Sequence, residues 1–141
     1  MAPSPHWVSL TRTEATFASD LGSVHVVDAQ RLPILSRLSI KRVVLASGAM
    51  REPQWNVNAN QLSYLLRGTV LVSILGDHNQ FSSFVVTPGQ MYHVESGAVY
   101  HIENIGPDEA EVIIALRSER PAHFSLRDSM SAMTDAVLGN T

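Results

Sequence analysis

Three amide side chains, Gln54, Asn56 and Gln61, lie in a stretch that begins at Gly48 and ends at Gly68. Residues two apart on an extended strand project to the same face, so Gln54 and Asn56 are expected to point into one cavity. A bend after Asn56 would bring Gln61 back beside them. A small β-barrel assembles facial sets of metal ligands with this spacing, but neutral amides are hydrogen-bonding groups and weak metal ligands. The stretch therefore predicts a polar cavity.

The intervals in this stretch resemble the first sequence motif of the cupins, in particular germins and the C-terminal half of oxalate decarboxylases. That motif runs glycine, five residues, His, one residue, His, three or four residues, Glu, six residues, glycine. This chain keeps both glycines and every interval. It carries Gln54, Asn56 and Gln61 where the family has its two histidines and its glutamate.

The second cupin motif runs glycine, five residues, Pro, one residue, glycine, two residues, His, three residues, Asn. Glu95 stands at the usual proline, and Tyr100 falls on the fourth ligand position. A one-residue insertion would instead place His101 at that position, and the sequence leaves this alternative open. Three further positions match the motif: Gly89, Gly97 and Asn104.

The altered ligand positions predict that no transition metal is bound tightly, and no other cofactor is expected. Manganese, iron and zinc sites of this kind use imidazole nitrogens and at least one carboxylate, whereas amides and a phenol are weak neutral oxygen donors. The reactions of oxalate decarboxylases, germin oxidases and dioxygenases need the ion to hold substrate or oxygen. Those activities are therefore not expected here.

The cavity is instead predicted to bind an organic small molecule through hydrogen bonds. Aligned donors stabilise developing negative charge, which suits a metal-independent cyclisation, isomerisation or dehydration, for instance in secondary metabolism. Proton transfer needs a titratable group, for which Tyr100 and Tyr64 are candidates and His93 is the better base. The alternative is a non-catalytic cupin that binds a ligand or serves in an assembly. The predicted catalytic set is Tyr100, Gln54, Asn56, Gln61 and His93.

Further residues are predicted to line the same cavity and bind substrate. Ser63 and Leu65 share the strand parity of Gln61. The resemblance implies that Arg51 holds an acidic or oxygen-rich ligand, with a surface ion pair to an acidic neighbour, Glu52 or Glu95, as the alternative. The predicted substrate-binding set is Arg51, Ser63, Tyr64, Leu65 and Ile102.

The composition bounds the class of protein. A chain of 141 residues with 45% hydrophobic content suits one domain with one core. The net charge of -3 gives no basic surface for nucleic acid, and no apolar run reaches the roughly 18 residues that span a bilayer. The absence of cysteine excludes disulfides. The first residues lack a signal-peptide pattern, from which a cytoplasmic location is expected.

The predicted fold is all-β, a cupin-type jelly-roll β-barrel with a C-terminal α-helix. Residues 1–22 are expected to form an N-terminal arm, 23–118 the barrel and 119–141 a helical segment, together one domain. Hairpins are expected across the turns at 67–69 and 106–108. Strands are predicted at 23–29, 38–47, 62–66, 70–75, 81–86, 91–95, 100–103 and 111–116.

The helix is predicted from a change of period near the C-terminus. Leu126, Met130, Met133 and Val137 are spaced by four, three and four residues, which is one face of an amphipathic helix. Ser125 would begin it as an N-cap residue. An exposed edge strand, together with the association that the resemblance implies, predicts a homodimer.

Overall fold

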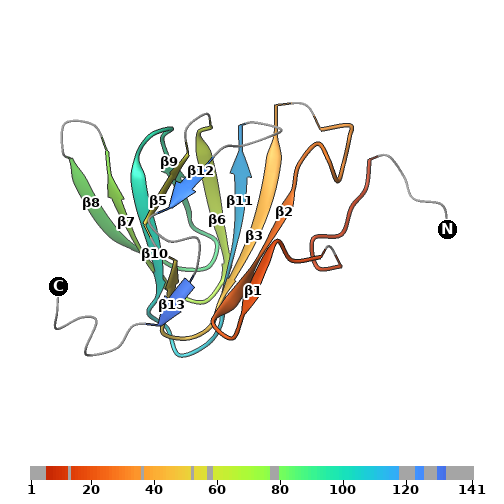
Figure 1. Ribbon diagram of the computed structural model, residues 1–141. Coiled ribbons are helices and arrows are strands. Elements are labelled where there is room, and N and C mark those ends of the chain that lie inside the picture. The colour runs from red at the N-terminus through yellow and green to blue at the C-terminus, as the bar shows by residue number, and fades with distance from the viewer. Residues whose placement is uncertain are drawn as a thin grey trace.

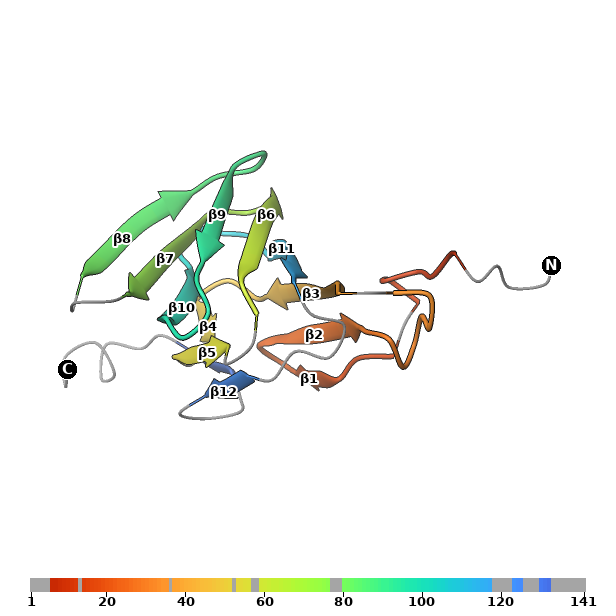
Figure 2. The ribbon, with the colours of Figure 1, turned by 90° about the horizontal axis from the view of Figure 1, so that it is seen from above.

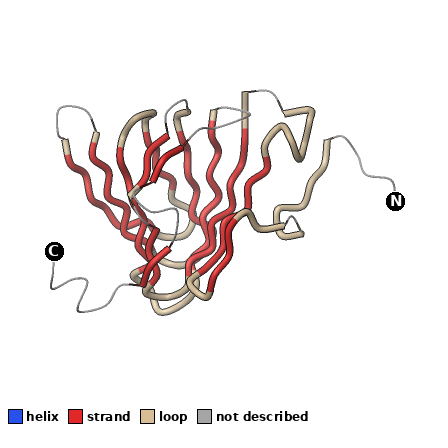
Figure 3. The backbone as a smooth tube through the Cα atoms, viewed as in Figure 1, coloured by secondary structure: helices blue, strands red, loops and turns tan. Residues whose placement is uncertain are grey.

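A computed structural model describes residues 6–12, 14–35, 37–51, 53–56, 59–76, 80–117, 123–125 and 130–132. All of the regular structure within these residues is β-strand, as the predicted fold class requires (Figure 3). No helix in this part of the chain is long and apolar enough to cross a membrane. The strands are β1 (Phe17–Ser19), β2 (Gly22–Val27), β3 (Ser39–Leu45), β4 (Ala49–Arg51), β5 (Gln54–Asn56), β6 (Gln61–Arg67), β7 (Val70–Leu75), β8 (Phe81–Val86), β9 (Met91–Val94), β10 (Val99–Asn104), β11 (Ala110–Leu116), β12 (His123–Ser125) and β13 (Met130–Ala132).

The strands form two antiparallel sheets that face each other across the barrel interior (Figures 1 and 2). Sheet A has the order β1-β2-β3-β11-β6-β9. In sheet B, β10 lies between β7 on one side and β4 and β5 on the other, with β8 beyond β7 and β12 and β13 beyond β5 and β4. The interior between the sheets is where the candidate site lies.

Strand alternation builds the core. Along β11, the even-numbered residues are buried and the odd-numbered ones are partly exposed, and β6 and β10 alternate in the same way. Val112, Ile114 and Leu65 are fully buried and face the interior from sheet A, while Val72 and Ile102 face them from sheet B. The burial of these aliphatic side chains is the main stabilising contribution, because each is worth about 1.5–3 kcal/mol.

The two hairpins predicted at 67–69 and 106–108 are wrong. β6 lies in sheet A and β7 in sheet B, and β10 and β11 are separated in the same way. At the first of these turns Gly68 has φ of +88°, and a Cβ there would lie 2.7 Å from Ala110. Hairpin turns and corners between sheets both use such residues, so the local sequence does not distinguish them.

Asn104 anchors the corner that follows β10. Its side chain is fully buried, and Nδ2 lies 2.8 Å from the carbonyl oxygen of Asp108 and 3.0 Å from that of Leu45. Its Oδ1 accepts a hydrogen bond from the backbone N–H of Gly106. The asparagine that ends the second cupin motif thus satisfies backbone groups at a sheet-to-sheet crossing.

The segments outside the predicted barrel also add strands. β1, within the predicted arm, pairs with β2, while β12 pairs with β5 and β13 with β4. The predicted C-terminal helix does not form where the structure describes it, because Ser125 lies in β12 and Met130 begins β13. The rest of that prediction falls outside the described residues. Backbone pairing with sheet B here outweighs the helical spacing of the apolar residues.

Candidate functional site

Gln54 and Tyr100 form the centre of a polar cluster inside the barrel. They are direct cross-strand partners on β5 and β10, so their side chains project to the same face. Gln54 is 2% exposed and Tyr100 1% exposed. The position that resembles the fourth cupin ligand therefore belongs to Tyr100. His101 faces the other side of β10, where its Nε2 lies 2.9 Å from Oε1 of Glu103.

Arg51 extends this cluster from the end of β4. Its side chain is buried, and Nη2 donates a hydrogen bond of 2.9 Å to Oε1 of Gln54. The other terminal nitrogen, Nη1, is buried and has no hydrogen-bond partner in the described part of the chain. A guanidinium nitrogen is only a donor, so Nη1 is free to bind an acceptor oxygen.

Gln61, Ser63 and Leu65 contribute the sheet A side of the interior. All three are buried on β6, as the shared parity predicts, and Ile102 is buried opposite them on β10. Gln61 donates from Nε2 to Oγ of Ser63 over 3.1 Å. Asn56 ends β5, but its side chain lies outside the described part of the structure.

Tyr92 is an interior residue that the sequence reasoning missed. It faces inward from β9 as the cross-strand partner of Ser63, and its buried hydroxyl makes no hydrogen bond within the described residues. Burial raises the pKa of this phenol well above its usual range, and the positive charge of Arg51 offsets part of the rise. Cross-strand partners project to the same face of a sheet, so the inward orientation of Ser63 would have indicated that Tyr92 also faces inward.

β3 supplies two further polar residues to the interior. Lys41 is 3% exposed and shares the inward parity of Val43, and Ser39 is fully buried with no partner for its Oγ among the described residues. The buried charged side chains of the described segments are therefore Lys41 and Arg51, with no buried carboxylate among them.

The comparisons with known proteins agree with this architecture. The cupin family model matches residues 8–141. This chain belongs to the cupin family. It is 30% identical over 125 residues to germin-like protein 3-8 of Oryza sativa subsp. japonica, covering 84% of the chain. It is 32% identical over 121 residues to Legumin A of Gossypium hirsutum, covering 83% of the chain.

A solved cupin structure is also similar. An oxalate oxidase in complex with the substrate analogue glycolate has a TM-score of 0.80 and 25% identity, covering 88% of this chain and 65% of that one. The chain spans 56% of the germin-like protein and 23% of Legumin A. Those proteins are thus larger than the part that matches.

The residues present in this cupin do not fit a transition metal. The described residues contain no group of three or more His, Asp or Glu side chains that could hold an ion. Oε1 of Gln54, at one ligand position, already accepts a hydrogen bond from Arg51, whose positive charge would oppose a divalent cation. Tyr100 offers a neutral phenol. Amide and phenol oxygens beside a guanidinium are a poor donor set for a divalent transition metal.

Two predicted site residues of this cupin lie outside the interior cluster. Tyr64 is on the outer face of β6 with 39% of its surface exposed, and His93 is exposed on the outer face of β9. Both have the opposite parity to their inward neighbours, Ser63 and Tyr92. His93 nevertheless lines a cavity of about 270 Å³ that also reaches Gln61, at the start of β6.

Proposed function

We propose that this cupin binds an oxygen-rich organic molecule, such as a carboxylate, inside its barrel without a metal, and catalyses a cyclisation, isomerisation or dehydration. The observation that supports the proposal most directly is the set of buried polar atoms without partners in the described structure: Nη1 of Arg51, Oη of Tyr92 and Oγ of Ser39. Each such group costs about 1–3 kcal/mol when it is left unsatisfied, so a ligand that bonds to them would be stabilised.

The proposed chemistry uses the donors of the cluster. Arg51 would hold a ligand carboxylate, while the hydroxyls of Tyr92 and Tyr100 would donate to a carbonyl oxygen on which negative charge develops. Gln54 would position Arg51 through their hydrogen bond. His93, on the outer face of β9, would exchange protons with bulk solvent at the cavity that it shares with Gln61.

A specific observation favours the alternative, a non-catalytic cupin. Some of the interior polar side chains already form hydrogen bonds with each other without any ligand: Arg51 donates to Gln54, and Gln61 donates to Ser63. If the protein is not catalytic, the polar residues would serve to stabilise the barrel through these hydrogen bonds. Binding and turnover must therefore be tested separately.

The test of binding is a thermal-shift titration with malonate and malate, using malonamide as the uncharged match. We expect the acids to raise the melting temperature by about 3 °C or more at saturation, and the amide to raise it less. Arg51→Met and Tyr92→Phe should abolish the rise. Arg12→Met, which removes an exposed arginine, is the matched control and should retain it.

Tyr92→Phe also reports on the empty protein, because removing an unpartnered hydroxyl should leave its stability unchanged or slightly higher. Equal shifts with acid and amide would contradict the proposal, as would stoichiometric manganese, iron or zinc in protein purified without chelator. For any compound that binds, NMR detection of product that is lost in Tyr100→Phe, with binding retained, would support the enzyme over the alternative.

We further propose that the protein acts in the cytoplasm as a homodimer. Support for the dimer comes from β8, which pairs only with β7 among the described strands and exposes Phe81 and Val85. A free strand edge of this kind favours pairing with another strand.

A further inference from the structure

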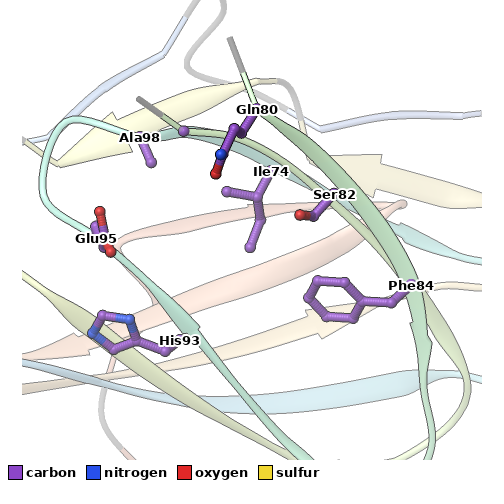
Figure 4. Close-up of a pocket in the computed structure, with 8 residues that line it drawn as sticks. Ile74, Gln80, Ser82, Phe84, His93, Glu95 and Ala98 are labelled. Carbon is purple, nitrogen blue, oxygen red and sulfur yellow. The ribbon is translucent and has the colours of Figure 1, made fainter. Parts of the chain in front are cut away.

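A second cavity, of about 440 Å³, lies outside the interior cluster between the edge strands of the two sheets (Figure 4). His93 and Glu95 lie on one side of it, and Ser82 and Phe84 of β8 lie on the opposite side. Its volume is in the range of small-molecule sites. None of Arg51, Gln54 and Tyr100 lines it, and His93 is the residue that it shares with the proposed function, so binding here can be tested separately through Glu95.

One part of the wall is apolar and held in place. Ile74, Phe84 and Ala98 provide it, and the ring of Phe84 packs edge-on against Tyr92, with centroids 6.1 Å apart and planes at 62°. Tyr92 is buried in the core, so the orientation of Phe84 is fixed from behind. A fixed aromatic ring offers its face to an apolar body or to a cation.

The other part of the wall is polar and available. The side chains of Ser82, His93 and Glu95 make no hydrogen bond or ion pair in the described structure, and His93 and Glu95 are exposed. Glu95 is the sole carboxylate among the described residues that line the cavity, and they include no lysine or arginine. It also stands where the cupin motif usually has proline, so this charge is a departure of this chain from the family pattern.

We propose that this cavity binds a small organic cation, an amine with an apolar or aromatic body. Glu95 would neutralise the ammonium group, His93 and Ser82 would accept its remaining hydrogen bonds, and Phe84 and Ile74 would cover the apolar body. The proposed interior site contains the buried guanidinium of Arg51, so the two sites would select ligands of opposite sign.

The test compares benzylamine with two probes that share its ring, benzyl alcohol and benzoate. Affinities are measured by ligand titration in ¹⁵N-resolved NMR at one fixed pH for all three probes. We expect benzylamine to bind about tenfold more tightly than benzyl alcohol, as one charge-assisted contact provides, and benzoate to bind most weakly. The shifted amide signals should lie in β8, β9 and the turn that contains Glu95.

Glu95→Gln should lower the affinity for benzylamine to that for benzyl alcohol and leave the alcohol unchanged. Glu14→Gln, which removes an exposed carboxylate elsewhere, is the matched control and should change neither. Phe84→Leu should weaken both probes. Equal affinities for amine and alcohol in the wild type, or shifts that map to Arg51 and Lys41 instead of β8 and β9, would overturn the proposal while leaving the interior site untouched.

Discussion

Glu111 lies on the outer face of β11 between two arginines from neighbouring strands. It accepts a hydrogen bond from Nε of Arg42, and Nε of Arg67 lies 3.1 Å from its other oxygen. Partial burial raises the pKa of Glu111, but the hydrogen bonds and charges of Arg42 and Arg67 outweigh this effect and lower it overall. The ion pairs therefore favour the charged carboxylate in the folded state.

We predict that Glu111→Gln lowers the free energy of unfolding by about 1 kcal/mol near pH 7, where the carboxylate is charged. Because the pKa of Glu111 is lower in the folded state than in the unfolded state, the carboxylate stabilises the folded protein at pH values above its unfolded-state pKa. This stabilisation is lost as the pH falls through the folded-state pKa. The two proteins should therefore converge in stability as the solution is acidified through the glutamate range. Urea denaturation at a series of pH values measures the difference, and a constant gap at all pH values would refute the ion-pair explanation.

Strand alternation predicts correctly which side chains of the candidate site face the barrel interior. Gln54, Gln61, Ser63 and Tyr100 were predicted to face inward by alternation and motif spacing, and all four are buried there. His93 was selected for its chemistry, although its neighbour Tyr92 has the inward parity and the buried hydroxyl. Side-chain type alone therefore does not predict which residues enter a barrel.

Asn104 joins β10 to the corner that crosses between the sheets. Its side-chain amide donates to the carbonyl oxygens of Leu45, at the end of β3, and of Asp108, and it accepts a hydrogen bond from the backbone N–H of Gly106. We predict that Asn104→Ala lowers the free energy of unfolding by about 3 kcal/mol, because buried backbone groups lose their partners. Chemical denaturation monitored by tryptophan fluorescence measures this loss.

Ser47→Ala provides the comparison for that prediction. Ser47 donates from Oγ to the carbonyl oxygen of Gly106 at the same corner, but its contact is exposed to solvent. Water replaces an exposed partner, so its loss should cost less than 1 kcal/mol, in the range of ordinary surface changes. Similar costs for the two variants would show that Asn104 does not hold the corner through its buried bonds.

The strands themselves were largely predictable from the sequence, whereas their pairing was not. β7 and β8 match the predicted ranges, and the other predicted strands differ from the observed ones by one or two residues at their ends. Alternation and β-branched residues are local signals. Which sheet a strand joins depends on contacts such as Gly68 against Ala110, far apart in the chain, and no local signal reports them.

At the scale of the whole molecule, motif spacing predicted the fold more securely than residue chemistry predicted the function. The four motif glycines, Gly48, Gly68, Gly89 and Gly97, all have positive φ, so their spacing is a requirement of the barrel corners. The ligand positions between them are free to change without loss of the fold. The function of a cupin barrel with amides and a phenol at those positions therefore has to be inferred from its side chains and not from its fold.

We predict that the protein associates through the free edge of β8. Phe81 and Val85 are 67% and 53% exposed on the outer face of this strand, which contains no charged residue or proline. Two copies related by a two-fold axis would pair their β8 strands antiparallel and cover these side chains. We expect light scattering after size-exclusion chromatography to give the mass of a dimer, and Val85→Lys to give a monomer.

Ile105→Lys places the same charge on an exposed apolar residue in the turn after β10, so it should remain dimeric. A monomeric wild type, or a monomeric Ile105→Lys beside a dimeric Val85→Lys, would exclude pairing through β8.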